Sequence, residues 1–325
     1  MRKYNLPIFI PHRGCPHGCA FCSQRKITGV ETEVTPKQVR EMVKSFLQTV
    51  DAEEALIEVA FFGGSFTGLE LKTQEEFLKV AAEFYPYVSG VRMSTRPDYI
   101  NDEILTLLKK YGVTTIELGV QSSDDEVLRL NNRGHNFESV KKASEMIKDY
   151  GISLGHQMML GMYGSTPEKD LKTVSDIIEL NPSCVRIYPV IIFKGTAIEE
   201  YFNRGKYMPY SIEKAAEVAK VAVAKFRDAG IDVIRLGLHS SEDFQDGETV
   251  VAGPYHPAFG EVVESLILRD KIEEEFLKSG QKNGEFIYYC KSQQISQAVG
   301  HKKMNKTYFE EKYNMRLKVA AREEE

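Results

Sequence analysis

The stretch LPIFIPHRGCPHGCAFC, residues 6–22, joins an apolar run to three closely spaced cysteines. The run at 6–11 is typical of a buried strand. Cys15, Cys19 and Cys22 follow it with C-x3-C-x2-C spacing. Thiolates this close on one loop can converge on a single metal centre. The stretch therefore predicts a metal site directly after the first strand of the fold.

Strand-like and helix-like segments alternate along the chain as far as about residue 240. After the first strand, strands are expected at 55–64, 91–95, 113–121, 152–162, 183–192 and 231–238, and helices at 35–50, 73–85, 101–112, 136–151, 166–180 and 211–230. Such alternation implies a parallel sheet with right-handed crossovers. An open doubly-wound sheet and a closed or partial barrel both satisfy it, and both place the active site at the C-terminal ends of the strands.

The composition narrows the class of protein. Of 325 residues, 42% are hydrophobic, and the net charge of −5 argues against a globally basic nucleic-acid binder. No apolar run approaches the roughly 20 residues of a membrane helix. The cysteines are odd in number and clustered, which fits a reducing compartment and metal binding. The sequence predicts a cytoplasmic protein without a membrane partner.

The strand–helix pattern weakens beyond residue 240. We therefore expect a core at 1–240 and a C-terminal extension at 241–325 that packs on it. Within the extension, the sequence predicts a helix at about 259–279 and a strand at 285–290. A basic stretch at 301–318 could contact phosphate or form an ordinary mixed-charge helix surface.

Two kinds of metal centre are compatible with three thiolates. Zinc would need a fourth ligand, for which His12 and His17 are candidates. A [4Fe–4S] cluster could use the three cysteines and leave one iron open for chemistry. Cys184 and Cys290 lie in strand-like runs and are interpreted as buried apolar residues.

The position of the three cysteines, with Phe21 directly before the last of them, resembles the radical S-adenosylmethionine (SAM) superfamily. The resemblance implies an α/β fold, a partial (β/α)6 barrel with a small α+β C-terminal extension. It also implies a [4Fe–4S] cluster on Cys15, Cys19 and Cys22, with SAM on the fourth iron. In that family an electron from the cluster cleaves SAM, and the resulting 5′-deoxyadenosyl radical abstracts hydrogen from a substrate. A flavodoxin- or ferredoxin-type electron donor is an implied partner.

Further positions match SAM-binding residues of this superfamily. In FFGGSFTGL (61–69), the residues Gly63, Gly64 and Ser65 match the motif that holds the methionine amino group, although a tight turn alone would also use such glycines. Gln121 and Arg133 stand twelve residues apart, as in the oxygen-independent coproporphyrinogen oxidase group. There the two residues bind the ribose hydroxyls and the carboxylate of SAM. A strand-end Gln and a surface Arg are the alternative.

The segments STRPD (94–98), RIYPV (186–190) and KGTAIEEYFNRGKY (194–207) resemble the radical SAM half of the Elongator catalytic subunit, which acts on the wobble uridine of tRNA. The sequence departs from that family in its shorter cysteine spacing and in Ser94, where Glu is usual. We also expect it to lack an acetyltransferase domain and a basic N-terminal extension. Gln157 stands where the coproporphyrinogen group has a ribose-binding Asp. The resemblance implies a short Elongator-like enzyme that acts on RNA or tRNA.

Several polar residues are expected at strand ends or adjacent loops, where a substrate would bind. We expect catalytic roles for Lys194, Tyr188 and His156, and cofactor contact from Gln157. A hydrogen-bonded core histidine is the alternative for His156, and a residue that caps the core is the alternative for Tyr188. Further candidates are Arg96, Arg235 and His239.

Two other functions remain compatible with the sequence. A porphyrin-type radical decarboxylase or oxidase is suggested by the cysteine spacing and by the pair Gln121 and Arg133. A non-catalytic, metal-stabilised RNA-binding protein would also account for the cysteines and the basic tail.

Overall fold

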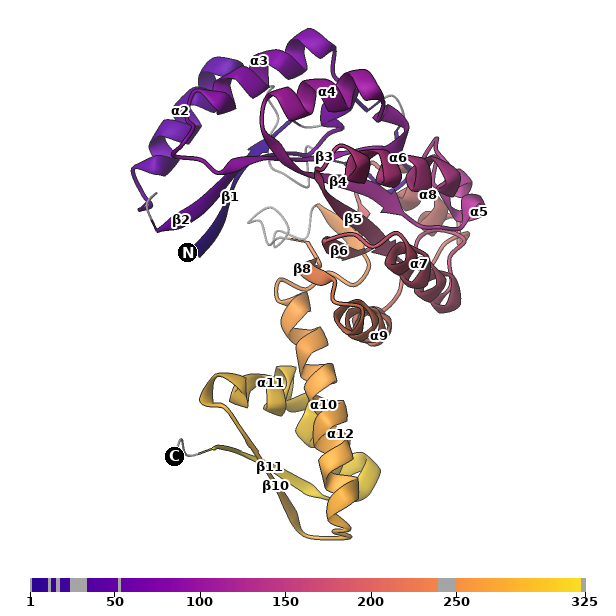
Figure 1. Cartoon of the computed structure of the whole chain (residues 1–325). Helices are drawn as coiled ribbons and strands as arrows, with labels where there is room; N and C mark the ends of the chain where they lie inside the picture. Colours follow the sequence, from indigo (N-terminus) through magenta and orange to yellow (C-terminus); the bar gives the residue numbers. More distant parts are fainter. Residues whose placement is uncertain are drawn as a thin grey trace.

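The computed structural model describes residues 2–10, 13–15, 18–23, 34–51, 54–238 and 249–322. Its main sheet has seven strands in the order β1-β2-β3-β4-β5-β6-β8, and every neighbouring pair is parallel. The sheet curves into a half-barrel, which confirms the predicted fold class (Figure 1). The strands are β1 (Arg2–Phe9), β2 (Ala55–Phe62), β3 (Gly90–Thr95), β4 (Val113–Gln121), β5 (Ser153–Leu160), β6 (Cys184–Pro189) and β8 (Asp232–Leu236).

Helices cover the convex face of this sheet (Figure 1). Local signals set where they begin. Thr35 caps α2 in a reciprocal capping box with Gln38, and Asn101, Asn136 and Thr166 cap later helices. The helices are α2 (Pro36–Leu47), α3 (Leu71–Ala82), α4 (Asp102–Lys110), α5 (Asp125–Leu130), α6 (Phe137–Asp149), α7 (Pro167–Glu179), α8 (Ala197–Asn203) and α9 (Ile212–Asp228).

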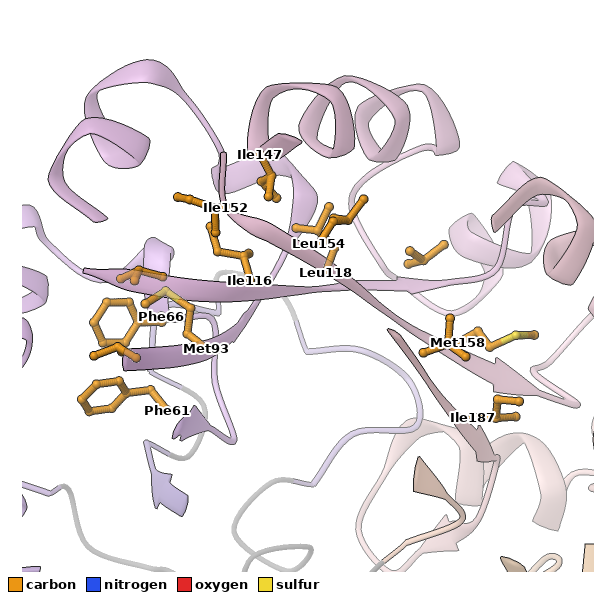
Figure 2. Close-up of a cluster of buried hydrophobic side chains, with 14 of the residues drawn as sticks. Phe61, Phe66, Met93, Ile116, Leu118, Ile147, Ile152, Leu154, Met158 and Ile187 are labelled. Carbon is orange, nitrogen blue, oxygen red and sulfur yellow. The ribbon is translucent and has the colours of Figure 1, made fainter. Parts of the chain in front are cut away.

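The main hydrophobic core lies between the sheet and these helices. Figure 2 shows Ile147 of α6 over the sheet, near Ile152, Ile116 and Leu154. Because successive side chains of a strand point to opposite faces, the outward residues build this core and the inward residues face the concave side. Other labelled members are Phe61, Phe66, Met93, Leu118, Met158 and Ile187.

At the start of the C-terminal part, β9 (Val250–Ala252) pairs antiparallel with the short strand β7 (Ile192–Phe193), which follows β6 in the chain. Helix α10 (Phe259–Ser279) then leads away from the half-barrel (Figure 1). Its far end packs in a second core with β10, α11, α12 and β11. These elements are β10 (Glu285–Cys290), α11 (Ile295–Val299), α12 (Met304–Tyr313) and β11 (Arg316–Ala321).

Sequence and structure differ mainly at element ends. The expected strand 183–192 is divided into β6 and β7, and α5 and α8 were not expected as helices. The basic stretch 301–318 holds both α12 and most of β11. The predicted domain boundary at residue 240 stays a prediction, since 239–248 lie outside the described residues. None of the helices in the described ranges has both the length and the apolar character needed to span a bilayer.

Candidate functional site

A cavity of about 1100 Å³ occupies the concave side of the half-barrel. All seven strands of the sheet contribute to its lining, and so does the loop that carries the cysteines. Most of the predicted site residues come together here. Those that line the cavity are Cys15, Cys19, Cys22, Gly63, Gly64, Gln121, Arg133, Gln157 and Tyr188, together with Arg96 and Arg235.

The cysteine loop, described at 13–15 and 18–23, is held by backbone hydrogen bonds from distant segments. The Ala20 amide donates to the Asn131 carbonyl at 3.0 Å, and the Ile198 amide donates to the Ala20 carbonyl at 2.9 Å. The ring of Phe21 is buried in a small apolar cluster that also includes Ile198. Phe21, conspicuous in the sequence, thus fixes the loop between α5 and α8. His12 and His17, the candidate zinc ligands, lie outside the described residues.

Glycines bring the cysteine loop into direct contact with the turn at 63–68, which we call the glycine turn. A Cβ at Gly14 would lie 2.0 Å from the Ser65 carbonyl oxygen, and one at Gly68 would lie 2.1 Å from the Gly14 carbonyl oxygen. At Gly64 a Cβ would lie 2.4 Å from the Arg13 carbonyl oxygen. Real Cβ atoms do not approach this closely, so these positions accept only glycine. The motif therefore has a packing role that sequence reasoning missed.

The third member of the predicted motif, Ser65, connects two strand ends. Its hydroxyl lies 2.9 Å from Thr95 Oγ1 and accepts from the Arg96 amide at 3.2 Å. The side chain is buried and is absent from the cavity lining among the described residues. Ser65 therefore positions the end of β3 beside the glycine turn.

Gln121 and Arg133 both reach the cavity beside the end of β4. Gln121 has a φ of +67°, and the pairing of β4 with β5 shifts register next to it. Arg133 donates from Nη2 to the Gly119 carbonyl at 2.7 Å and from Nη1 to Cys19 Sγ at 3.3 Å. Gly119 leaves the room for both side chains, since a Cβ there would lie 3.0 Å from Gln121 Nε2 and 3.1 Å from Arg133 Nη2. A positive φ at a non-glycine residue often marks a functional site.

Burial and neighbouring charges act in opposite directions on the pKa of the Cys15 thiol. Burial raises the pKa of the Cys15 thiol, and the neighbouring Cys19 raises it further. The positive charges of Arg133 and Arg96 act in the opposite direction. Negative charge on the cysteine loop would thus be stabilised by two guanidinium groups.

An ion network of the buried Glu117 with the half-buried Glu58, Arg92 and Arg186 crosses the floor of the cavity. Glu117 accepts from Arg186 Nε at 2.5 Å and from Arg92 Nη1 at 2.9 Å. Arg92 also donates to Glu58 at 2.8 Å. Burial opposes ionisation of Glu117, but Arg186 and two further donors outweigh it, so its pKa is lowered. Sequence analysis missed this network; charged residues at inward positions of otherwise apolar strands were the available signal.

Gln157 and Tyr188 belong to the same floor. Gln157 Nε2 donates to Ser94 Oγ at 2.8 Å and to Glu117 Oε2 at 2.9 Å. Burial raises the pKa of Tyr188, so its hydroxyl stays protonated at neutral pH. Ser94 and Gln157 are therefore hydrogen-bonded to one another.

Two predicted catalytic residues do not line the cavity. His156 precedes Gln157 on β5 and points to the opposite face, where its Nε2 lies 2.9 Å from Ser144 Oγ of α6. Burial lowers the pKa of His156 to about 3. Lys194 is exposed just after β7, and its amide donates to the Thr249 carbonyl at 3.1 Å. His239 lies outside the described residues.

Comparison with known families decides the class of protein. Residues 9–177 match the Radical SAM superfamily, and residues 182–269 match the Radical_SAM C-terminal domain. The chain belongs to the radical SAM superfamily. It is accordingly a radical SAM enzyme, and members of this superfamily bind a [4Fe–4S] cluster and SAM.

Curated relatives make this radical SAM enzyme Elongator-like. The chain is 31% identical over 253 residues to a tRNA uridine(34) acetyltransferase of Methanocaldococcus infernus, covering 64% of this chain and 47% of that protein. It is 27% identical over 255 residues to human Elongator complex protein 3, covering 64% of this chain and 46% of that protein. The chain thus spans about half the length of the curated relatives it matches.

Solved structures agree on the fold of the radical SAM enzyme. The archaeal Elp3 of Methanocaldococcus infernus with an N-terminal deletion superposes with a TM-score of 0.63 at 24% identity, covering 85% of this chain and 63% of that chain. Coproporphyrinogen III oxidase from Escherichia coli superposes with a TM-score of 0.50 at 18% identity, covering 70% and 52%.

The cysteine-loop side of the cavity fits a cluster and SAM. Three thiols from one loop line it beside Arg133, so a negatively charged thiolate cluster would be stabilised there. Among the described residues, Gln121 Oε1 and Arg133 Nε are buried without a hydrogen-bond partner. Buried polar atoms without partners are costly, so an acceptor and a donor that face a cavity indicate a polar ligand. SAM, with its ribose hydroxyls and carboxylate, offers both complementary groups.

Proposed function

We propose that this radical SAM enzyme modifies RNA, with tRNA as its substrate, in the cytoplasm. The observation that carries the proposal is the match of 64% of the chain to proteins named for uridine 34 of tRNA. The large cavity beside the cysteine loop supports it, since a flipped-out base needs such a concave site. Acetyl transfer is left out of the proposal, because the match covers only about half of those proteins.

We assign the cluster to Cys15, Cys19 and Cys22. When bound and reduced, the cluster supplies the electron for the reductive cleavage of SAM. The protein holds the thiols at one side of the cavity through the contacts of the cysteine loop with Asn131 and α8. We assign the electron to a flavodoxin- or ferredoxin-type protein, because one-electron reduction at low potential is the task of such carriers.

SAM is assigned to the ends of β2 and β4. Gly63 and Gly64 offer backbone groups to the methionine part, while Ser65 holds the turn in place. Arg133 is suited to the carboxylate because guanidinium donors form a planar fork. The unpartnered Gln121 Oε1 is suited to accept from a ribose hydroxyl.

The substrate is assigned to the rest of the concave face. Tyr188 lines the cavity with a protonated hydroxyl, which can donate to a base carbonyl. Gln157 is held by Ser94 and Glu117 with its amide donor already engaged, so its carbonyl is the group left for a ligand. His156 and Lys194 stand outside the lining and receive no substrate contact in this proposal.

Two measurements test the proposal in steps. After anaerobic purification and reconstitution, the protein should contain four iron atoms, and SAM with dithionite should yield 5′-deoxyadenosine. A colourless protein with one zinc would contradict the cluster assignment. Next, tRNA nucleosides from cells with and without the gene are compared by mass spectrometry. Loss of one modified nucleoside is expected, and identical nucleoside profiles would contradict the RNA substrate while leaving the cluster chemistry intact.

A further inference from the structure

The C-terminal extension presents one open face of its two-stranded sheet. The strands β10 and β11 are parallel, and in the described part of the chain they pair only with one another. Burial alternates along β10: Phe286, Tyr288 and Cys290 pack into the second core, whereas Ile287 and Tyr289 are 38% and 51% exposed. The other side of this sheet is therefore free of the core. We call it the open sheet face.

The neighbouring strand β11 carries cations on the same face. The register pairs Ile287 with Lys318 and Glu285 with Arg316. The side chains of Arg316 and Lys318 are 79% and 58% exposed, and both approach the Glu285 carboxylate at 3.6 Å. One carboxylate cannot neutralise two cations, so the open sheet face keeps excess positive charge.

The C-terminal part of the chain is more basic than the chain as a whole. Residues 280–325 contain nine Lys and Arg and six Glu, whereas the full chain has a net charge of −5. Not all of these cations are available. Lys312 is engaged by Glu273 at 2.6 Å and by the ring of Tyr308. The cations of β11 have no comparable anchoring contact among those the described residues make.

We propose that the open sheet face binds a single-stranded segment of the RNA substrate. This inference rests on the proposed function and adds where the RNA is held. An exposed aromatic ring on a sheet is a stacking platform for a base, and flanking cations bind the phosphates. Tyr289 supplies the ring, Ile287 extends the apolar surface, and Arg316 and Lys318 supply the charge.

Anionic lipid is the other partner that such charge could attract. A membrane-surface segment buries a continuous apolar stripe of large side chains. The open sheet face has only two large apolar residues on β10, Ile287 and Tyr289, and the register pairs them with Lys318 and Ala320. One exposed ring on the same face as two cations suits a base and its phosphates better than an acyl layer.

The experiment measures binding of a 20-nucleotide single-stranded RNA to the reconstituted full chain by fluorescence anisotropy at several salt concentrations. The double variant R316Q/K318Q should weaken binding and reduce the salt slope by about 1.4, because each phosphate contact of a single strand contributes about 0.7. Tyr289→Ala should weaken binding at least about fivefold and leave the salt slope unchanged, since stacking is not ionic. Tyr289→Phe should bind like the natural protein.

The control variant is Lys72→Gln in the first turn of α3, an exposed lysine on the convex side of the half-barrel. It removes one positive charge elsewhere and should leave the salt slope and the affinity unchanged. All variants should cleave SAM with dithionite as the natural protein does, which shows that they are folded.

Three results would overturn the inference. Equal RNA affinity in R316Q/K318Q and the natural protein would show that the open sheet face does not bind the RNA, while the proposed function would stand. Binding to phosphatidylserine vesicles without binding to the RNA would show that the cations of the open sheet face bind anionic lipid and not RNA. Equal loss of affinity in Lys72→Gln would show a general charge effect. By contrast, the proposed function fails on the nucleoside comparison, whatever these binding curves show.

Discussion

The cofactor side and the floor of the cavity are built by different kinds of contact. On the cofactor side, the cysteine loop and the glycine turn meet backbone to backbone, with Gly14 and Gly68 in direct approach. On the floor, long side chains meet in the ion network around Glu117. The backbone contact on the cofactor side is therefore sensitive to added atoms. The ion network on the floor is sensitive to the loss of a charge. Each can be disturbed separately, which gives four predictions.

The largest effect is expected from the cofactor side, with Cys19→Ala. This variant removes one thiol and the sulfur that Arg133 approaches at 3.3 Å. Iron content after reconstitution should fall, and 5′-deoxyadenosine formation should drop to background. Cys290→Ala is the matched control, since this thiol is buried in the second core. If Cys19→Ala kept SAM cleavage, the assignment of the cluster to this loop would be wrong.

The next prediction tests the backbone contact by adding one methyl group. Gly68→Ala would place a Cβ 2.1 Å from the Gly14 carbonyl oxygen, whereas a Cβ at Gly18 meets nothing within 4 Å. Overpacking of this kind costs about 3 kcal/mol, so Gly68→Ala should unfold at lower denaturant and bind less iron. Gly18→Ala, in the same cysteine loop, should do neither. Equal behaviour of the two variants would contradict the packing role of the glycines.

The floor is tested by Glu117→Gln, which keeps the shape and removes the charge. A buried ion pair that loses one partner costs about 3 kcal/mol, a little less here because Gln retains an acceptor. The pKa of Glu117 is lowered below its ordinary value of 4.5, so its stabilising contribution is complete above that pH and is lost as the pH falls below it. Denaturation at pH 7 and pH 4 should show the difference between variant and natural protein shrinking on acidification. A difference independent of pH would contradict an ionised Glu117.

The smallest effect is expected at His156, behind the floor. Its pKa of about 3 means that its contribution is present above the ordinary value of 6.5 and is lost as the pH falls through the interval between them. His156→Gln should remove about 2 kcal/mol of the stability change between pH 6.5 and pH 5. Part of that change should persist, since the pKa of His135 is also lowered to about 3. SAM cleavage should be unchanged in this variant. A large loss of SAM cleavage would indicate a catalytic role for His156.

The sequence predicted what depends on local order. The C-x3-C-x2-C spacing, the alternation of strands and helices, and caps such as Thr35 are properties of neighbouring residues, and the fold follows from them. The pair Gln121 and Arg133 was expected from the resemblance to the coproporphyrinogen oxidase group, and the structure places both at the cavity beside Cys19. Helix α10 was predicted with the bounds that the structure has.

The sequence did not predict what depends on contacts between distant segments. That Gly14 faces Gly68, or that Glu117 bridges Arg92 and Arg186, is set by the register of strands far apart in the chain. The side of β5 on which His156 lies follows from period-two alternation, but only once the inward position of Gln157 is known. In each case the sequence alone did not show which segments would face one another in the fold.

Helix α10 has a consequence for how the two parts of the chain work together. Its first half packs in the main core through Phe259 and Val263, and its second half packs in the second core through Ile272 and Phe276. With 21 residues it is about 31 Å long. One continuous helix shared by two cores acts as a rigid spacer, so the extension stays at a set separation from the cavity. An RNA held at the far end would reach the cavity only with a strand of matching length, and the enzyme would choose its nucleotide by distance as well as by chemistry.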